Sequence, residues 1–210
     1  MSEFDPVKRV ERLRKARPKR AEEIGERVPP GQYTTEKFPV LTFGSAPGID
    51  LDTWRLRVFG LVEQPVELPW QEFAALPTVT LETDIHCVTR WSKLDTVWEG
   101  VPFKEFMNRV KPKPEAKFVM QHSFGGYTTN LALEELLEDD VLLAYKFNGT
   151  LLDPDHGGPM RMLVPKLYFW KSAKWLNGLE FMAEDKPGFW EGYGYHNHGD
   201  PWKEERFSKP

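Results

Sequence analysis

The chain has 210 residues, 40% of them hydrophobic, and a net charge of -4, so it is large enough for one domain with its own core. This modest charge gives no reason to expect a nucleic-acid partner, and no apolar run reaches the roughly 18 residues that indicate a membrane span. The single cysteine excludes an internal disulfide and an ordinary protein-only zinc site, and it fits a reducing, cytoplasmic compartment.

The first segment, residues 1–30, has the composition of a basic arm ahead of a main domain at residues 31–210. Its cations are crowded together with few apolar residues between them: Lys8, Arg9, Arg12, Arg14, Lys15, Arg17, Lys19 and Arg20. No apolar stretch of about 7–15 residues and no small-residue cleavage site follows, so an export signal is not expected. The pattern instead predicts a solvated helix or arm that wraps the domain surface, anchored by Val7, Val10 and Leu13.

The next segments alternate apolar and polar residues, which is the period of a β-strand. This pattern predicts strands at residues 54–59 and 66–68, joined by a turn near Gln64-Pro65, and a short helix at residues 69–73. A further strand covers residues 79–86 and ends immediately before Cys87. Cys87 is therefore expected where a strand gives way to a loop.

Pro102 opens a predicted helix whose apolar residues fall on one stripe, namely Phe103, Phe106, Met107 and Val110. Beyond it the pattern predicts strands at residues 117–122, 141–147, 160–164 and 179–182 and a helix at residues 131–138. Asn148-Gly149 is a hairpin turn signal because both residues tolerate positive φ. Strands outnumber helices and alternate irregularly with them, so the predicted fold class is α+β, a single mixed domain with a β-rich core.

Cys87 lies in a segment with several polar groups, residues 84–92. The residue itself allows three interpretations: a buried core cysteine, a nucleophile, or one thiolate on a metal that brings its other ligands along. His86 is adjacent, but neighbouring residues on a strand point to opposite faces, so a Cys/His hydrolase is not expected.

Cations interrupt two apolar stretches further along the chain. Arg161 lies inside an apolar strand, and Lys171 and Lys174 are interleaved with aromatic residues. Such cations are costly to bury unless an anion meets them. The alternative is that their aliphatic stems pass the aromatic rings and carry the charges to solvent.

Read together, these stretches resemble the molybdopterin-binding domain of the sulfite oxidase superfamily, most closely its small, haem-free bacterial and archaeal members. The likeness covers residues 38–207, and its most specific pieces are Asp84–Trp98, Gly157–Pro165, Trp170–Trp175 and Gly194–Trp202. The resemblance implies the sulfite oxidase fold and Mo-molybdopterin as cofactor. It also implies that Cys87 is the thiolate ligand of molybdenum, while dithiolene sulfurs and oxo groups complete the coordination.

The resemblance further implies a set of cofactor contacts. Arg161, Lys171 and Lys174 match positions that hold the phosphate and the pterin, where Arg offers a planar fork and Lys a point charge. The other matching positions are Val40, Leu41, Ser123, His156, Phe169 and Trp170. His156 stands where the family often has Asn, and Ser123 stands where it often has Thr.

The activity that the resemblance implies is two-electron oxygen-atom transfer, between Mo(VI) and Mo(IV), on a small oxyanion, sulfoxide or N-oxide. Arg90 is a candidate for attracting the substrate and Trp91 for walling the pocket, although a surface ion pair also explains Arg90. The related periplasmic reductase of protein methionine sulfoxide reads Cys-Val-Glu-Ala-Trp-Ser where residues 87–92 read Cys-Val-Thr-Arg-Trp-Ser. The same substrate is therefore not implied.

The expected partners are a small-molecule substrate and a separate, unidentified electron carrier, because no haem domain and no C-terminal dimerisation domain fits in the sequence. Two interpretations from other classes stay open. One is a molybdopterin-binding module or carrier without turnover. The other is a structural domain whose Cys87 is buried and inert.

Overall fold

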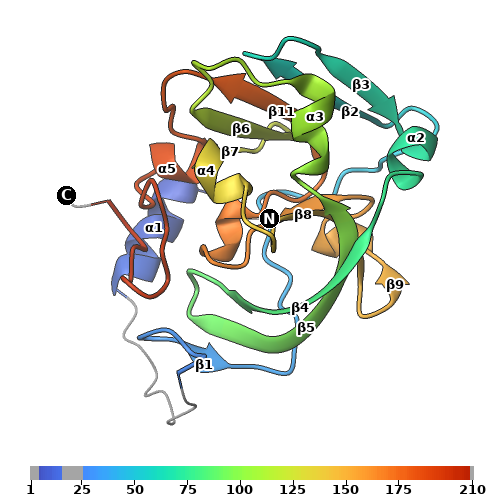
Figure 1. Cartoon of the computed structure of the whole chain (residues 1–210). Coiled ribbons are helices and arrows are strands. Elements are labelled where there is room, and N and C mark those ends of the chain that lie inside the picture. The colour runs from blue at the N-terminus through green and yellow to red at the C-terminus, as the bar shows by residue number, and fades with distance from the viewer. Residues whose placement is uncertain (1–4, 16–25, 209–210) are drawn as a thin grey trace.

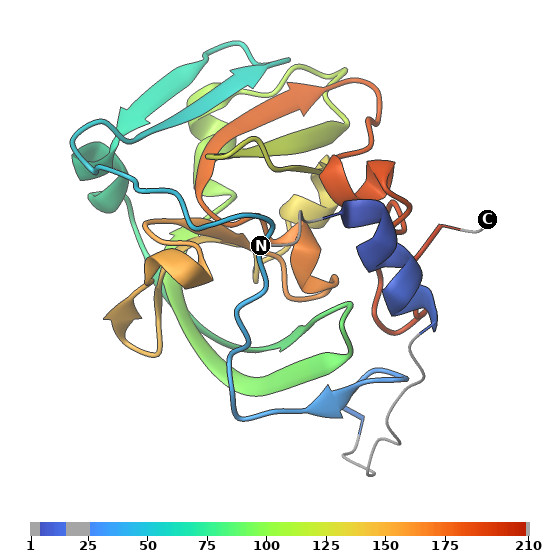
Figure 2. The same ribbon diagram turned by 180° about the vertical axis from the view of Figure 1, so that it is seen from behind.

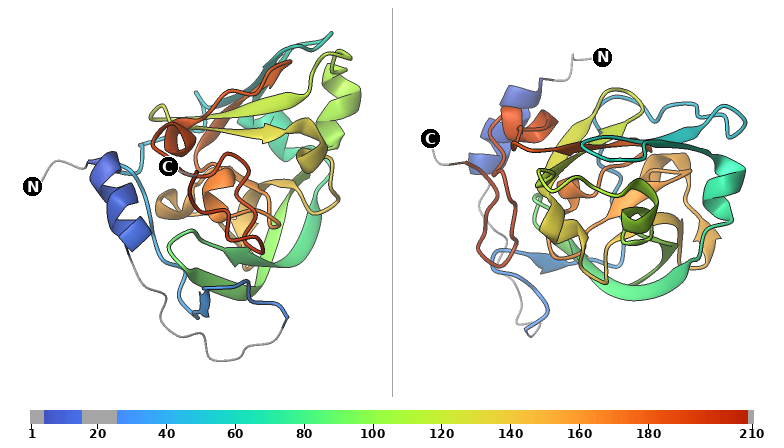
Figure 3. Two further views of the ribbon diagram at one scale, coloured as in Figure 1. Left: turned by 90° about the vertical axis from the view of Figure 1, so that its left-hand side faces the viewer. Right: turned by 45° about the horizontal axis from the view of Figure 1, so that its top comes forward.

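The computed structural model describes residues 5–15 and 26–208, and its strands form two sheets that lie as separate layers (Figure 1, Figure 3). The first sheet contains β1 (Tyr33–Thr34), β4 (Val79–His86), β5 (Trp91–Pro102), β8 (Leu142–Phe147), β9 (Thr150–Leu151) and β10 (Arg161–Leu163). Its strand order is β1-β5-β8-β10, with β4 paired to β5 and β9 paired to β8. β5 therefore pairs with β1, β4 and β8.

The second sheet contains β2 (Arg55–Gly60), β3 (Val66–Pro69), β6 (Phe118–Ser123), β7 (Thr128–Ala132) and β11 (Leu176–Met182). Its order is β3-β2-β11-β6-β7, in which only the β2–β11 pair is parallel. The helices are short: α1 (Pro6–Lys15), α2 (Trp70–Ala74), α3 (Glu105–Val110), α4 (Leu133–Leu136), α5 (Phe189–Gly192) and the 3₁₀ turns η1 (Pro154–His156) and η2 (Phe169–Lys171). Within the described ranges, none of them is long and apolar enough to cross a membrane.

The predicted α+β class and the single β-rich domain are confirmed by this architecture. The predicted strands correspond to β2, β3, β4, β6, β8, β10 and β11, and the helix predicted at residues 69–73 corresponds to α2. Asn148 and Gly149 have φ angles of 47° and 79° and join β8 to β9 as a hairpin, as predicted.

The structure corrects three expectations about secondary structure. β1, β5, β7 and β9 were not among the predicted strands. The helix expected from Pro102 begins only at Glu105, because Pro102 is the last residue of β5. The helix expected at residues 131–138 shrinks to α4, because Leu131 and Ala132 pair with β6.

β5 contains a bulge that changes which side chains share a face. The register with β4 shifts between Thr83 and Ile85, where β5 carries an extra residue, and Asp95 there adopts a φ of 54°. Trp91 and Trp98 are an odd number of residues apart, so a regular strand would place them on opposite faces. With the bulge, both belong to one buried cluster and pack against Phe38, with ring centroids 6.2 and 6.0 Å from it.

The buried side chains form two clusters. The first core cluster draws on both sheets and includes Trp54, Phe73, Phe103, Phe106 and Leu179. The second core cluster includes Ile85, Cys87, Trp91, Trp98, Tyr168, Trp170, Trp190 and Tyr195. The only cysteine of the chain therefore lies in an aromatic-rich region at one end of the β4–β5 hairpin.

Helix α1, from the predicted basic arm, packs on this second core cluster, beside α5 (Figure 2). Val10 is 3% exposed and Leu13 packs against the cluster, whereas Val7 stays 49% exposed. Arg14 donates from Nη2 to the carbonyl oxygen of Gly194 at 3.3 Å. The predicted cations Arg17, Lys19 and Arg20 lie outside the described residues.

Candidate active site

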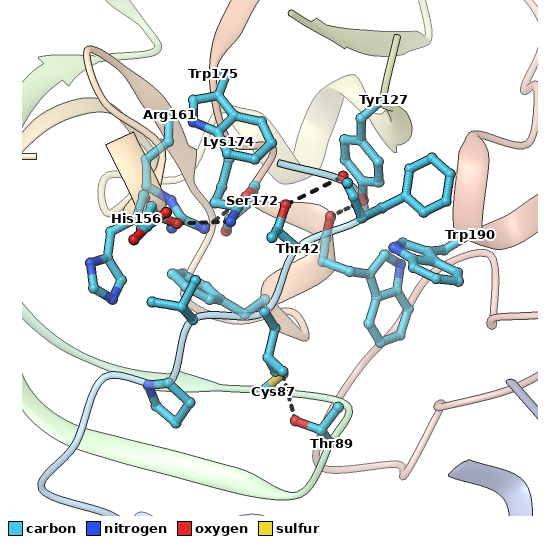
Figure 4. Close-up of a pocket in the computed structure, with 18 of the residues that line it drawn as sticks. Thr42, Cys87, Thr89, Tyr127, His156, Arg161, Ser172, Lys174, Trp175 and Trp190 are labelled. Atoms are coloured by element: carbon cyan, nitrogen blue, oxygen red, sulfur yellow. Dashed lines mark hydrogen bonds between the residues drawn. The ribbon is translucent and has the colours of Figure 1, made fainter. Parts of the chain in front are cut away.

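A cavity of about 300 Å³ opens where the turn between β4 and β5 meets residues 38–47, the segment around η1 and η2, and α5 (Figure 4). Cys87 lines it, and Arg161, Lys174 and His156 gather on one side while Trp190 and Tyr127 lie on the other. Segments far apart in the sequence thus converge on the single thiol.

The β4–β5 turn is a tight hairpin loop that holds Cys87 in place. The backbone N–H of Cys87 donates to the carbonyl of Trp91, and that of Arg90 donates to the carbonyl of Cys87, both at 2.9 Å. Arg90 closes the loop with a φ of 78°, as the last residue of such a turn often does. Gln32 donates from Nε2 to the carbonyl oxygen of Cys87 at 3.1 Å, which ties the loop to the segment before β1.

The thiol of Cys87 is 7% exposed and faces the cavity. Burial raises its pKa, which favours the protonated thiol in the cofactor-free chain. The hydroxyl of Thr89 donates to Sγ at 3.2 Å and opposes this effect, since that hydrogen bond stabilises a thiolate. A metal cation bound at Sγ would displace the thiol proton.

His86 lies on the other side of the strand from Cys87, as the alternation of β4 predicts. Its ring lines a separate outer pocket with Arg27 and Trp202, and Nδ1 hydrogen-bonds the Ser92 hydroxyl at 2.8 Å. Burial lowers the pKa of His86 to about 4. His86 therefore does not act as a base for the thiol.

Arg161 supplies a buried cation to the cavity. It is 2% exposed, and its guanidinium lies 4.0 Å from the ring centroid of Phe169. Nη1 donates to the carbonyl of His156 at 2.8 Å and Nη2 to the carbonyl of Ser172 at 2.9 Å. Burial lowers the pKa of Arg161 to about 9, the direction expected for a cation without charge compensation.

Lys174 is the second cation on this side of the cavity. Its ammonium donates to the carbonyl of Asp155 at 2.9 Å and lies 4.4 Å from the ring centroid of Trp175. Burial, followed by the positive charge of Arg161, lowers the pKa of Lys174 to about 8. Ser172, between Lys171 and Lys174 in the chain, also lines the cavity, and its hydroxyl accepts from the N–H of Val164 at 2.9 Å.

This side of the cavity is suited to an anionic group. The hydrogen-bond acceptors of Arg161 and Lys174 among the described residues are main-chain carbonyls, which carry no net charge. Two neighbouring cations with depressed pKa values are stabilised when an anion enters. The hydroxyl of Ser123 is buried without a hydrogen-bond partner in the described structure, but only its neighbour Phe124 lines the cavity.

His156 fixes one edge of the cavity and lines it. It belongs to η1, whose first turn is capped by Asp153, and its Nδ1 pairs with Asp153 Oδ2 at 2.8 Å. Its Nε2 hydrogen-bonds the carbonyl of Phe38 at 3.0 Å, and the two rings stack at 4.0 Å. His156 therefore positions the segment that carries Val40 and Leu41 along the cavity.

Lys171 does not line the cavity, although the sequence predicted a phosphate contact there. Its side chain is fully buried and its ammonium lies 2.6 Å from Oε1 of Glu191. It also donates to the carbonyl of Asn130 at 2.8 Å. Because a carboxylate already neutralises it, Lys171 links η2 to α5 instead of facing a ligand in the cavity.

Arg90 and Ser123 also lie outside the lining of the cavity. Arg90 is half-buried, and its Nη1 donates to the carbonyl of Gly31 at 3.4 Å. Its neighbour Trp91 does line the cavity, together with Phe169 and Trp170. Of the two predicted substrate contacts, the structure brings only Trp91 to the thiol.

Several lining residues were not singled out from the sequence: Arg9, Thr42, Tyr127, Ser172, Trp190 and Tyr195. Tyr127 donates to the carbonyl of Trp170 at 2.6 Å, and burial raises the pKa of its hydroxyl well above the usual value. Ser172 carried a usable signal, since it lies inside the stretch that also contains Lys174. The other residues are ordinary in sequence and reach the cavity only through the fold.

Residues 43–190 match the family described as oxidoreductase molybdopterin binding domain. The chain belongs to this family. The matched region contains Cys87, Arg161 and Lys174, whereas Arg9 precedes it. The molybdopterin-binding domain thus includes the thiol and two of the cations that line the cavity, Arg161 and Lys174.

Relatives of this molybdopterin-binding domain include proteins named as oxidoreductases. The uncharacterized oxidoreductase YuiH of Bacillus subtilis (strain 168) is 49% identical over 183 residues, which make up 87% of this chain and 92% of that protein. Sulfite oxidase of Arabidopsis thaliana is 28% identical over 182 residues, 70% of this chain and 46% of that enzyme. This chain therefore spans less than half of that enzyme.

A solved structure shares the fold of the molybdopterin-binding domain. The sulfane dehydrogenase SoxCD from Paracoccus pantotrophus aligns with a TM-score of 0.60 and 23% identity, over 66% of this chain and 40% of that chain. Together with the family match, this confirms the predicted sulfite oxidase-like fold, the oxidoreductase class and Mo-molybdopterin as the cofactor. The roles of individual residues and the cytoplasmic location stay predictions.

Proposed function

We propose that the chain catalyses two-electron oxygen-atom transfer to or from a small oxyanion, sulfoxide or N-oxide, with Cys87 as the thiolate ligand of molybdenum. In the oxidising direction the substrate gains one oxygen atom from water, and two electrons and two protons are released; in the reducing direction the balance is reversed. The observation that carries the proposal is that the only cysteine of the chain lines a cavity whose opposite side bears two cations facing uncharged acceptors.

Bound Mo-molybdopterin supplies the redox-active metal and the remaining sulfur ligands, which is why one protein thiolate suffices. Arg161 and Lys174 hold the phosphate of the pterin, with Ser172 beside them on the same wall. Arg161 contributes a planar fork of donors and Lys174 a point charge. His156 keeps the segment with Val40 and Leu41 against the cofactor through its bond to Phe38.

The surrounding residues prepare Cys87 and its pocket. Thr89 keeps a donor on Sγ at 3.2 Å, which stabilises the thiolate. Trp91, Phe169 and Trp170 wall the cavity and exclude bulk water, which strengthens charge interactions inside it. In this proposal a separate carrier exchanges the two electrons with the site.

The first test replaces the proposed ligand. Cys87→Ser is expected to lose molybdenum-dependent turnover by at least about a hundredfold, and also the thiolate-to-metal absorption, because a hydroxyl is a poor ligand for this soft site. The measurements are metal and pterin content, the absorption spectrum, and turnover with artificial electron donors and acceptors. Arg109→Ala, an exposed cation on α3, is the control for handling and expression.

The substrate panel for this test contains sulfite, nitrate, sulfoxides and N-oxides, assayed in both directions. Turnover retained by Cys87→Ser would contradict the ligand assignment. Wild-type protein from a molybdate-replete host that holds cofactor but turns over none of these substrates would favour the carrier interpretation instead.

A further inference from the structure

Helix α1 lies outside the region that matches the molybdopterin-binding family, yet it forms part of the cavity wall. Val10 is 3% exposed and belongs to the same buried cluster as Cys87, Trp190 and Tyr195. This docking places Arg9, the preceding residue, among the residues that line the cavity. The basic arm thus contributes one of its cations to the site.

The surroundings of Arg9 hold its guanidinium near the thiol. Its Cζ lies 5.9 Å from the ring centroid of Trp190, on α5. The positive charge of Arg9 favours the ionised form of both the Tyr195 hydroxyl and the Cys87 thiol. An aromatic face orients a guanidinium through a cation–π contact.

Arg9 is distinct from the two cations assigned to the cofactor. Arg161 and Lys174 are bonded to carbonyls of the segment from η1 to η2, whereas Arg9 belongs to the wall formed by α1 and α5. Arg206 also lies near Cys87, but it donates to the carbonyls of Val88 and Pro30 and does not line the cavity. Among the described lining residues, Arg9 is therefore the arginine or lysine on the α5 side of the thiol.

We propose that Arg9 is a specificity-determining residue, which binds the negative charge of a small oxyanion substrate beside Cys87. This inference rests on the proposed oxygen-atom transfer and deepens it, because it favours an anionic substrate over a neutral sulfoxide or N-oxide. A cation set among aromatic walls attracts a compact anion strongly, since little water competes for it. In this proposal helix α1 contributes a substrate-binding residue to the site.

The first test uses the holoenzyme and sulfate as a non-reacting anion. Arg9→Gln keeps a polar side chain of similar length, and Arg12→Gln on the same helix is the matched control, because Arg12 is exposed. Isothermal titration of sulfate is expected to show a loss of affinity of about tenfold or more for Arg9→Gln, as a charge-assisted hydrogen bond is removed. Arg12→Gln should stay within about twofold, in line with the small effect of exposed charges.

The same variants separate charge recognition from a general defect. For Arg9→Gln, KM for an anionic substrate should rise while kcat and the KM of a neutral substrate change little. Arg9→Lys should recover part of the lost affinity, because it restores the charge without the planar fork. No sulfate binding by the wild type, or equal binding by wild type and Arg9→Gln, would overturn the proposal.

A second test reads the charge near Cys87 without any cofactor. The chain has one cysteine, so alkylation of the full-length cofactor-free protein reports only on this thiol. The rate ratio of anionic iodoacetate to neutral iodoacetamide should fall about fivefold in Arg9→Gln and stay unchanged in Arg12→Gln. An unchanged rate ratio in Arg9→Gln would contradict anion binding by Arg9, even if the wild type catalyses oxygen-atom transfer. A lowered ratio would support anion binding by Arg9, even if the wild type shows no such activity.

Discussion

Lys171 and Lys174 show how one residue type takes two roles within a few positions of the chain. Burial lowers the pKa of both ammonium groups. Lys171 is compensated by Glu191 at 2.6 Å, so its charge is neutralised within the protein. Lys174 donates to a main-chain carbonyl and is repelled by Arg161, while the charges of Asp155 and Asp153 offset this effect only in part, so a ligand anion can compensate the rest.

This difference predicts a pH dependence for the cofactor-free chain. The folded-state pKa of Lys174 is about 8, below the ordinary value of 10.5. The unfolded chain therefore binds more protons at this residue between pH 8 and 10.5, and its contribution to the free energy of unfolding falls as pH drops through that window. Wild type should gain stability relative to Lys174→Met between pH 8 and pH 10, measured by urea unfolding.

Groups that do not interact with Lys174 titrate alike in the two proteins and cancel in this comparison. Arg161, whose pKa is about 9 and whose charge acts on Lys174, contributes to the difference together with Lys174. Parallel stability curves for the two would mean that Lys174 is not desolvated in the folded chain. With phosphate-bearing cofactor bound, the difference should disappear, because the anion restores the charged form of the lysine.

At the scale of elements, the bulge in β5 determines which side chains of this strand line the cavity. The extra residue at Asp95 brings Trp91 onto the face that holds Trp98 and Phe38. Asp95 also accepts a hydrogen bond from Arg27 at 2.6 Å, and Arg27 binds Asp84 on the neighbouring strand as well. The bulge is thus fastened from the segment before β1.

Deletion of Asp95 should straighten β5 and turn Trp91 away from the cavity, because side-chain direction alternates along a regular strand. We expect cofactor content per chain to fall by at least about tenfold, since a misplaced wall costs several kcal/mol of binding. Pterin and molybdenum analysis of purified protein provides the measurement.

Asp95→Gly is the matched control for this deletion. Glycine adopts a φ of 54° without strain, so the bulge and the direction of Trp91 are preserved while the Arg27 contact is lost. This variant should keep wild-type cofactor content. Wild-type cofactor content in the deletion variant would show that the bulge in β5 is not needed for cofactor binding.

The bulge also explains what the sequence could and could not reveal about the fold. Regular alternation made β2 and β4 predictable, but β5 changes parity at Asp95 and so lacks a continuous strand pattern. Gly100 adds a second irregularity, because a Cβ there would meet the carbonyl oxygen of Leu143 at 2.5 Å. Such a close approach of two strands has no signature in local sequence.

Some residues of the site could likewise be predicted from their neighbours in sequence, whereas others depend on contacts between distant segments. Cys87 and Arg161 stood out as polar groups in apolar segments, and both line the cavity. Lys171 looked equivalent to Lys174 because the partner that distinguishes them, Glu191, lies on a separate element. Arg9 was one of many cations in the arm, and only the burial of Val10 selects it.

At the scale of the whole molecule, the cavity joins parts of the chain that the two sheets do not connect directly. Its lining comes from α1, the segment 38–47, the β4–β5 turn, η1, η2 and α5. The cations on its wall repel one another when no anion is present. Cofactor binding should therefore stabilise the entire fold and not only the loops that touch it.

Removal of the cofactor provides the corresponding prediction. A ligand present at about a thousandfold excess over its Kd adds about 4 kcal/mol to the free energy of unfolding. For a domain of this size that corresponds to a rise in Tm of roughly 10 °C. Protein from a molybdate-depleted, pterin-deficient host should melt lower by about this amount in calorimetry, with unchanged far-ultraviolet circular dichroism. Equal Tm values would contradict binding in this cavity.

Because Cys87 is the only cysteine of the chain, its oxidation cannot be reversed by a second thiol of the same chain. Sulfenic acid is normally rescued by condensation with a second thiol, and this chain contains one cysteine. An oxidised Cys87 therefore has no internal partner and proceeds to irreversible sulfinic acid unless an external thiol reaches the cavity. Because a thiolate bound to metal is shielded from this chemistry, early loading of the cofactor would act as the protein's own antioxidant protection.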